Sequence, residues 1–555
     1  MATASCSANR SRLVRRIDRL LAGTAEFALP SPRSQKGGSA VLNRILTVGG
    51  LTLASRVTGF LRDIMLAAIL GAGPVADAFF IALRLPNHFR AIFAEGAFNA
   101  AFVPAYARIR GQAGAAPARL FADRVFTMLF AVEAVLLAAA LLFTPAVISL
   151  LAPGFREDPH RFALAVELTR ITFPYLLLVS LVTLYGGILN ALQRFASPAA
   201  APILLNLSMM ATLALAVFFP TAGHAAAWGV FIAGCLEATM VAADLAHRDG
   251  LPKFRELKWD DDVRRFFRAL GPATLGSAGT QIALFADTII ASFLAAGAVS
   301  ALYYADRLNQ LPIGVIGIAI GTVLLPEMAS RIAVGDEAGA RHAQDRAIEL
   351  TLLMSIPCLV AFIVVPDLIM LALFSRGAFT AADASAAGAT LAAYSIGLLP
   401  FVLLRSVSSC FLARGDTATP VKALLVSVVV NVALKIVLMG RYAQVGLAFA
   451  TSIGVWVNFS LLTWFAMRAK LMSIDARLRT SVMKLALAGL ALAAALLLAA
   501  APVAGLTASA GPLGHVAALL ALAVLGAAVY GGTVAAMFGS QWLTAFRRRR
   551  ARSVP

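Results

Sequence analysis

Arginine and carboxylate side chains interrupt apolar segments at three places in the chain, around residues 55–63, 77–90 and 306–307. An ionisable group within hydrocarbon is costly unless it faces a partner or a water-filled cavity, so each of these groups is a candidate site residue. A guanidinium group is well suited to bidentate recognition of phosphate. These residue types therefore predict a site for an anionic, phosphate-bearing ligand. The candidate residues are Arg56, Arg62, Asp63, Asp77, Arg90, Asp306 and Arg307.

Each of these groups, taken singly, could instead form a structural ion pair between helices or reach the lipid headgroups. As a group they are harder to explain in that way, because the arginines outnumber the nearby acids if they converge. A net cationic cavity favours an anionic substrate. Glycine and proline residues beside these charges, at Gly59, Pro86 and Pro312, are predicted hinges because they can bend a helix.

A second polar group, Asp287, Asn431 and Lys435, lies in apolar segments of the second half. These residues could form a coupling-ion site, but Lys435 would compete with a bound cation. We expect a structural pair between Asp287 and Lys435 instead.

The elements that must position these residues are membrane helices. The chain has 555 residues, of which 60% are hydrophobic and only 14% charged. About fourteen windows of ~20 apolar residues fit between residues 41 and 537. The fold class predicted is an all-α polytopic membrane protein with about 14 transmembrane helices.

Motifs for soluble chemistry are missing from the sequence. The six histidines are scattered, the four cysteines are far apart, and no zinc-protease, nucleophile-elbow or P-loop pattern occurs. We therefore expect no enzyme activity, no metal and no cofactor.

The net charge of +19 indicates orientation rather than nucleic-acid binding. Most Lys and Arg residues fall in alternate loops on one side, which places both termini in the cytoplasm by the positive-inside rule. These basic residues are dispersed, so no nucleic-acid partner is expected, whereas membrane lipids are. The opposite loops carry only Arg156, Arg161, Arg376 and Arg441.

An internal repeat divides the chain. The aromatic pair Phe79-Phe80, followed by Arg84 and Pro86, corresponds to Tyr303-Tyr304, followed by Arg307 and Pro312. Further weak matches recur in order at a similar separation, which predicts a parallel repeat of two six-helix lobes around a central cavity. The predicted parts are a basic, disordered cytoplasmic tail (1–40), an N-lobe (41–247), a C-lobe (248–470), and two further helices with a basic cytoplasmic tail (471–555).

Several motifs occur together in order: Ser55-Arg-Val-Thr-Gly-Phe-Leu-Arg-Asp63, Ala76-Asp-Ala-Phe-Phe80, Leu85-Pro-Asn87, Ile92-Phe-Ala-Glu-Gly-Ala-Phe98, Tyr303-Tyr-Ala-Asp-Arg-Leu308, Gly321-Thr-Val-Leu-Leu-Pro326 and Arg414-Gly-Asp-Thr-Ala-Thr-Pro420. With them the chain, from about Val41 to Met537, resembles the MurJ (MviN) family of bacterial lipid II flippases. That family belongs to the multidrug/oligosaccharidyl-lipid/polysaccharide exporter superfamily.

The resemblance implies two lobes around a V-shaped cavity and a groove for the lipid tail on the last two helices. It places the family's cavity arginines at Arg56, Arg62 and Arg307, and its acids at Asp63 and Asp77. Many members have two consecutive basic residues where this chain has Arg90 followed by Ala91, so Arg90 has to serve for both. Some members hold sodium in the second lobe, a role that Lys435 disfavours here.

The resemblance implies a lipid II flippase of the bacterial inner membrane. It would move the undecaprenyl-diphosphate-linked precursor of peptidoglycan to the outer leaflet by alternating access, driven by membrane potential or an ion gradient. Other cell-wall synthesis proteins are a candidate class of partner. The alternatives are another polyprenyl-linked oligosaccharide flippase, a cation-coupled drug exporter, which would need an acidic cavity, and a membrane-embedded glycan polymerase, which would need acids in a large external loop.

Overall fold

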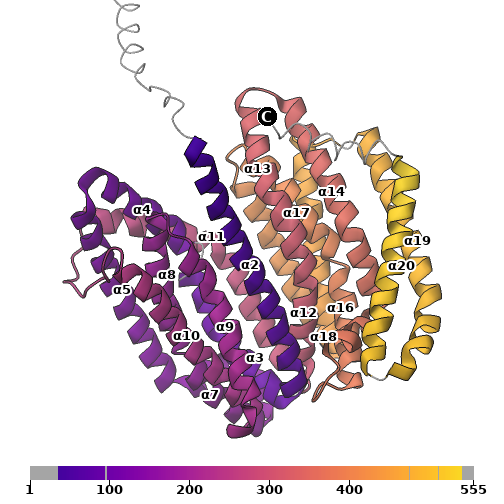
Figure 1. The fold of residues 1–555 in the computed structure, drawn as a ribbon, viewed down its shortest axis with the longest axis horizontal. Helices are drawn as coiled ribbons and strands as arrows, with labels where there is room; N and C mark the ends of the chain where they lie inside the picture. The colour runs from indigo at the N-terminus through magenta and orange to yellow at the C-terminus, as the bar shows by residue number, and fades with distance from the viewer. Residues whose placement is uncertain (1–34, 94–96, 474, 511, 540–555) are drawn as a thin grey trace, which may run out of the picture. The chain divides into compact units, whose positions relative to one another are not determined.

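The computed structural model describes residues 35–93, 97–473, 475–510 and 512–539, and every regular element among them is helical (Figure 1). Its contacts divide the chain into two compact units, Met1–Leu51 and Thr52–Pro555. Residues 1–34 of the predicted N-terminal tail, residues 94–96 of the Ile92–Phe98 motif and the basic tail 540–555 lie outside the described residues. All contacts discussed below fall within the second unit.

A first group of helices runs from the start of the chain to the middle. α3 packs on α7, α8 and α10, α4 packs on α5 and α8, and α9 packs on α10. The bounds are α2 (Gln35–Leu70), α3 (Pro74–Phe93), α4 (Ala97–Ala113), α5 (Ala115–Leu142), α6 (Thr144–Leu151), η1 (Pro153–Glu157), α7 (Pro159–Thr172), α8 (Tyr175–Ala191), α9 (Ala196–Ala214), η2 (Ala216–Phe218) and α10 (Ala222–Ala246).

A second group follows, with α12 packed on α16, α13 on α14, and α17 on α18, while α19 and α20 pair with each other and contact α14 and α15 respectively. α11 touches both groups, through α3 and α4 on one side and α18 on the other. The bounds are α11 (Asp261–Ser292), α12 (Ala298–Pro312), η3 (Ile313–Gly317), α13 (Ile318–Ala333), α14 (Glu337–Val364), α15 (Pro366–Phe374), α16 (Ala381–Ser395), α17 (Leu398–Leu412), α18 (Ala418–Arg468), α19 (Ala476–Thr507), η4 (Ala508–Ala510) and α20 (Pro512–Phe538).

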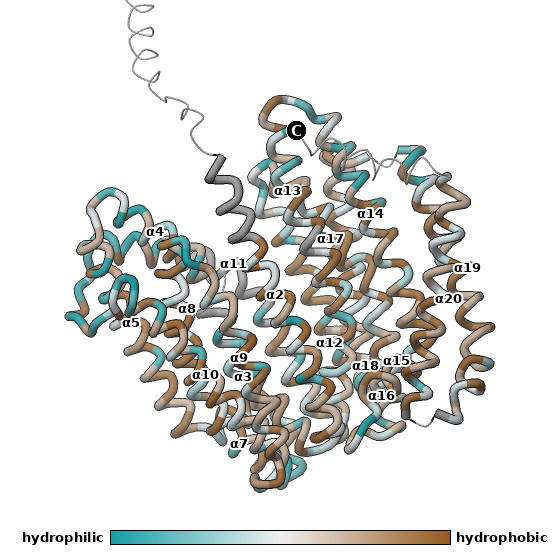
Figure 2. Tube along the Cα trace, in the orientation of Figure 1, coloured by the Kyte–Doolittle hydropathy of each residue, from teal (hydrophilic) through white to brown (hydrophobic). Residues whose placement is uncertain are grey.

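The predicted membrane windows fall on these helices. Within the described residues, ten helices are long and apolar enough to cross a membrane. One of the ten, α18, holds two predicted windows, because its 51 residues break at the non-helical Ala443. The windows outside that set lie on α2, α3 with α4, and α11, the helices that carry many of the ionisable residues. In Figure 2 hydrophobic residues are frequent along α19 and α20, whereas hydrophilic residues are frequent around α4 and the adjoining end of α5.

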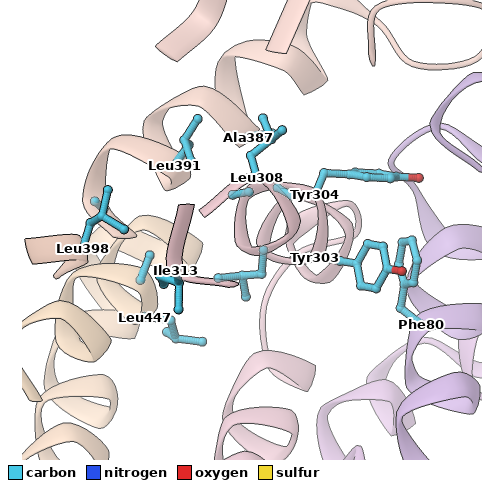
Figure 3. Packing of buried hydrophobic residues seen from close by; sticks show 14 of the residues in the cluster. Phe80, Tyr303, Tyr304, Leu308, Ile313, Ala387, Leu391, Leu398 and Leu447 are labelled. Carbon is cyan, nitrogen blue, oxygen red and sulfur yellow. The ribbon is translucent and has the colours of Figure 1, made fainter. Parts of the chain in front are cut away.

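The repeat-related aromatic pairs pack against each other. Phe80 of α3 stacks on Tyr303 of α12 with ring centroids 3.9 Å apart, and meets Tyr304 edge-on at 5.5 Å (Figure 3). Such aromatic pairs contribute beyond the apolar area they bury. The two aromatic motifs therefore join α3 to α12 in the hydrophobic core, and the repeat itself stays a prediction.

The segment between α10 and α11 is fixed by ion pairs. Asp249 has a 4% exposed side chain and lies 2.9 Å from Arg110 and 2.7 Å from Arg119. It also accepts a 2.6 Å hydrogen bond from the Tyr106 hydroxyl. Burial alone would raise the pKa of Asp249, but the hydrogen bonds from Arg119 and Tyr106 and the two guanidinium charges hold it below its ordinary value.

Asp249→Asn is expected to destabilise the protein by about 1–3 kcal/mol at neutral pH, because it removes a buried charge that receives these bonds. A pKa lower in the folded than in the unfolded state gives stabilisation that is complete above about pH 4 and is lost as pH falls through the folded value. Thermal unfolding of both proteins against pH measures this. A difference between them that stays constant from pH 7 down to pH 3 would contradict the assignment.

Candidate functional site

A cavity of about 560 Å³ lies between helices of the two groups, lined from α2, α3, α9, α12, η3 and α17. Five of its lining residues are arginines and one is an aspartate, an excess of four positive charges at the depth of the membrane helices. An anionic ligand offsets the cost of bringing these cations together. The charged lining residues are Arg56, Arg62, Asp63, Arg90, Arg307 and Arg405.

One carboxylate holds two of the arginines. Asp63 lies 2.8 Å from Arg62 and 3.6 Å from Arg307, and accepts a hydrogen bond of 3.2 Å from the Tyr303 hydroxyl. Asp63 and Arg62 are buried, whereas the Arg307 side chain is 42% exposed. Arg307 also lies over the Tyr303 ring, 4.8 Å from its centroid. The site thus orients the Arg307 guanidinium while leaving it accessible from the cavity.

Asn206 of α9 fixes the other side of Arg62. Its carbonyl oxygen accepts a 2.9 Å hydrogen bond from Arg62, and its amide nitrogen donates to the Ser55 carbonyl and the Thr58 hydroxyl. The same amide packs on Gly59, where an added Cβ would lie 3.4 Å away. Gly59 therefore permits a close approach between α2 and α9, and its predicted hinge role stays a prediction.

Arg56 reaches across to the second group of helices. A Cβ added at Gly314 would lie 2.6 Å from an Arg56 nitrogen, so this glycine makes room for the guanidinium. Gly314 belongs to η3, a π-helical turn that directly follows Pro312. A π-helical turn interrupts the regular hydrogen bonding of a helix. Pro86 lies inside α3, and the hinge roles of Pro86 and Pro312 stay predictions.

Arg90 lines the same cavity from α3. Behind it, the Tyr175 hydroxyl donates to Glu237 over 3.4 Å, and both groups lie within electrostatic reach of Arg90. The structure connects Glu237 to a cavity arginine through Tyr175.

Asp77 of α3 is not among the residues that line the cavity. Its side chain lies instead at the N-terminal end of α12. Its carboxylate accepts hydrogen bonds from the Gly297 amide (2.8 Å), the Ser300 amide (2.8 Å) and the Ser300 hydroxyl (2.6 Å). The side chain is completely buried. It is therefore a cap that joins α3 to the N-terminus of α12, where a helix favours negative charge.

Asp306 also lies apart from the cavity lining. It accepts a 3.4 Å hydrogen bond from Gln310 and lies within electrostatic reach of Arg84, Asp287 and Arg307. Asp306 therefore belongs to a group of charged residues that includes Arg84 of α3, Asp287 of α11 and Lys435 of α18.

Lys435 and Asp287 form an ion pair between α18 and α11, as the sequence predicted. Lys435 is 2% exposed, and it also lies within electrostatic reach of Arg84 and Asp306. No cluster of three or more metal-ligating side chains occurs in the described parts of the chain. The ammonium group is thus held as a structural charge between two helices.

Lys435→Met should lower the free energy of unfolding by about 3 kcal/mol, because it leaves Asp287 without its buried counter-ion. Adding Asp287→Asn to the same chain should restore most of that loss, since no uncompensated charge then remains. Thermal unfolding of the single and double variants in detergent measures both effects. Additive losses in the double variant would show that the two side chains do not act as a pair.

Sequence reasoning missed Arg405 of α17 and Asn206 of α9, which both line the cavity. Arg405 has a signal in the sequence, since it stands alone in the apolar segment Leu398–Leu412. An isolated arginine at membrane depth is a default site candidate. Asn206 has no comparable signal, because single amides are common at helix contacts.

Comparison with known proteins decides the family. The model of the family described as lipid II flippase MurJ matches residues 66–512. The chain belongs to the MurJ family of lipid II flippases. A probable lipid II flippase MurJ of Rhizobium meliloti (strain 1021) is 40% identical over 469 residues, covering 83% of this chain and 87% of that protein. A lipid II flippase MurJ of Burkholderia cenocepacia is 34% identical over 432 residues, covering 77% and 83%.

Solved structures agree on the fold. A lipid II flippase MurJ in an inward closed conformation matches with a TM-score of 0.73 and 23% identity, over 88% of this chain and 98% of that chain. A multidrug resistance MATE transporter of the MOP superfamily in an inward-facing conformation matches with a TM-score of 0.54 and 16% identity, over 77% and 98%. The MurJ family therefore confirms the predicted fold class and places this chain among transporters rather than enzymes.

Proposed function

We propose that the chain carries lipid II, the undecaprenyl-diphosphate-linked precursor of peptidoglycan, from the inner to the outer leaflet of the bacterial cytoplasmic membrane. The observation that carries this proposal is the cavity with its excess of four positive charges. A diphosphate has matching charge and accepts bidentate hydrogen bonds from guanidinium groups. A cationic drug would meet repulsion in the same cavity.

Arg307, Arg56 and Arg405 are the proposed diphosphate ligands, with Arg62 and Arg90 completing the positive lining. Arg307 comes from α12 and Arg56 from α2, so a ligand bound to both joins the two halves of the repeat. Binding energy shared across the halves favours a state in which they have closed on the headgroup. The lipid tail stays in the bilayer, beside the α19–α20 pair, during this step.

Contacts at the predicted outward end support alternating access. Besides the Asp77 cap, the Ala378 amide donates to the Ala68 carbonyl over 2.8 Å, and the Tyr304 hydroxyl donates to the Gly71 carbonyl over 3.2 Å. Topology places these groups together at the same end of α2, α3, α12 and α16. They close the route outward, and their release would open the cavity to the outer leaflet.

The positive-inside rule gives the proposed orientation. Both termini lie in the cytoplasm, as do the helix ends and loops that carry Arg119, Arg255, Arg346 and Arg414. The membrane potential is the proposed source of energy for transport, because one charge crossing 100 mV is worth ~2.3 kcal/mol. Other cell-wall synthesis proteins are further proposed partners.

Depletion of the protein in its native host tests the proposal. Lipid II should accumulate in the inner leaflet, and its labelling from outside the cell should fall, before peptidoglycan synthesis stops. Re-expression of the chain restores outside labelling. Undiminished outside labelling during depletion would reject lipid II as the substrate.

A further inference from the structure

A second cavity lies away from the arginine-lined one, where the start of α19 meets α14 and the end of α20. It has a volume of about 410 Å³, within the range of small-ligand sites. Its lining combines charges of both signs with hydroxyl groups and one aromatic ring. The lining side chains used below are Glu349, Arg477, Thr480, Ser481, Lys484 and Phe538.

The least exposed polar side chain of this cavity is a carboxylate. Glu349 of α14 is 4% exposed. Its Oε1 accepts a 2.7 Å hydrogen bond from Ser481, but its Oε2 has no hydrogen-bond donor, and the nearest cation is Arg346 at 3.5 Å. A buried carboxylate oxygen without a donor is unfavourable. An N–H donor entering the cavity would satisfy it.

Two cations of the lining lie on α19 on either side of Ser481, the residue that bonds Glu349. Arg477 is exposed at the start of α19, and Lys484 follows seven residues later on the same face. Lys484 donates to the Met537 carbonyl over 2.8 Å and lies 5.1 Å from the Phe538 ring centroid, so α20 holds it in place. The cavity thus presents two positive charges along α19 and one negative charge from α14.

The position of the cavity matches the level of lipid headgroups. The 32 residues of α19 span ~48 Å, whereas the hydrocarbon core is ~30 Å thick, so the first turns of α19 project into the interface. The end of α18, the loop after it and the first turn of α19 carry Arg468, Lys470, Arg477 and Arg479, and the positive-inside rule predicts that this segment faces the cytoplasm. Exposed leucines, including Leu487 and Leu490, continue from the cavity along α19.

We propose that this cavity binds the headgroup of a phosphatidylethanolamine from the inner leaflet. The phosphate lies between Arg477 and Lys484, and the primary ammonium donates to Glu349 Oε2. The acyl chains follow the exposed leucines of α19. An anionic lipid without an amine leaves Oε2 unsatisfied, and a quaternary amine has no N–H to donate.

The test uses the purified full chain in detergent and lipids with identical acyl chains, with binding measured by native mass spectrometry. Phosphatidylethanolamine should bind about 5-fold more tightly than phosphatidylcholine or phosphatidylglycerol, the effect of one net hydrogen bond. Arg477→Ala should weaken its binding about 5-fold or more, whereas Arg479→Ala, a matched loss of charge outside the cavity lining, should not. Equal binding of the three lipids would overturn the proposal.

Glu349→Gln should abolish the preference over phosphatidylcholine, because an amide places its own donors where the ammonium would sit. Should this variant fail to fold, mono- and dimethylated phosphatidylethanolamine give the same test on the unaltered protein, with affinity falling as N–H groups are lost. Unchanged affinity across that series would also overturn the proposal. Competition by soluble phosphoethanolamine at equal concentration would assign the cavity to a soluble ligand instead.

This site does not depend on the substrate of the arginine-lined cavity. Arg307→Glu should leave the lipid preference intact, and Arg477→Ala should leave lipid II bound in the first cavity. The two proposals therefore fail separately.

Discussion

Arg307→Glu is expected to lower lipid II transport by at least about 100-fold and to abolish growth of cells that depend on this chain. The substitution removes a cation that faces the cavity and places a second carboxylate beside Asp63, 3.6 Å from the original guanidinium. Losing one partner of a charged, hydrogen-bonded pair costs about 2–5 kcal/mol, which is the size of this effect. Complementation and outside labelling of lipid II measure it.

Arg441→Glu is the matched control, because it reverses one charge at an exposed position of α18 outside the cavity lining. It should support growth at the rate of the unaltered chain. Folding of both variants is checked by amount in the membrane and by thermal unfolding. Full growth with folded Arg307→Glu would remove Arg307 from the diphosphate site.

Asp77→Ala is expected to open the outward end of the protein about 100-fold more often. The carboxylate accepts three hydrogen bonds from the first turn of α12, and bonds to a buried charge contribute about 1.5–3 kcal/mol. A loss near 2.8 kcal/mol corresponds to the factor of 100. Because the bonds join α3 to α12, their loss weakens contact between the two halves.

The measurement is the labelling rate of Ala298→Cys by a membrane-impermeant maleimide, in a chain whose native cysteines are replaced. Ala298 is 6% exposed in the closed arrangement. Asp158→Ala is the control, since Asp158 caps α7 through the amides of His160 and Arg161. An equal rise in labelling with both variants would indicate general loosening instead of an outward gate.

Helices and the meeting of Arg56, Arg62 and Arg307 were predictable from the sequence. Long apolar windows leave little choice of element in a membrane, because only helices and closed barrels satisfy their backbone there. The charged residues inside apolar segments identified the individual arginines, and the predicted repeat and the family resemblance both favoured their meeting in one cavity.

The tertiary contacts of individual side chains were less predictable. Asp77 looked like a cavity acid, but the groups that bind it, at Gly297 and Ser300, are more than 200 residues away in the chain. Nothing in its local spacing indicates a helix cap of that kind. Asp306 is likewise absent from the cavity lining, although the sequence analysis placed it in one site with Arg307. Arg405 belonged to none of the motifs and was overlooked although its apolar surroundings mark it.

The carboxylate of Asp63 has a consequence for the half of the cycle in which nothing is carried. After releasing its substrate, a flippase must return to its starting conformation with an empty site. Guanidinium groups without a counter-ion would repel one another in that state. Asp63, which is bonded to Arg62 and close to Arg307, supplies an internal counter-ion for that conformational change. A diphosphate bound as proposed would compete with Asp63 for Arg62 and Arg307, so this one side chain would set the strength of substrate binding against the ease of returning empty.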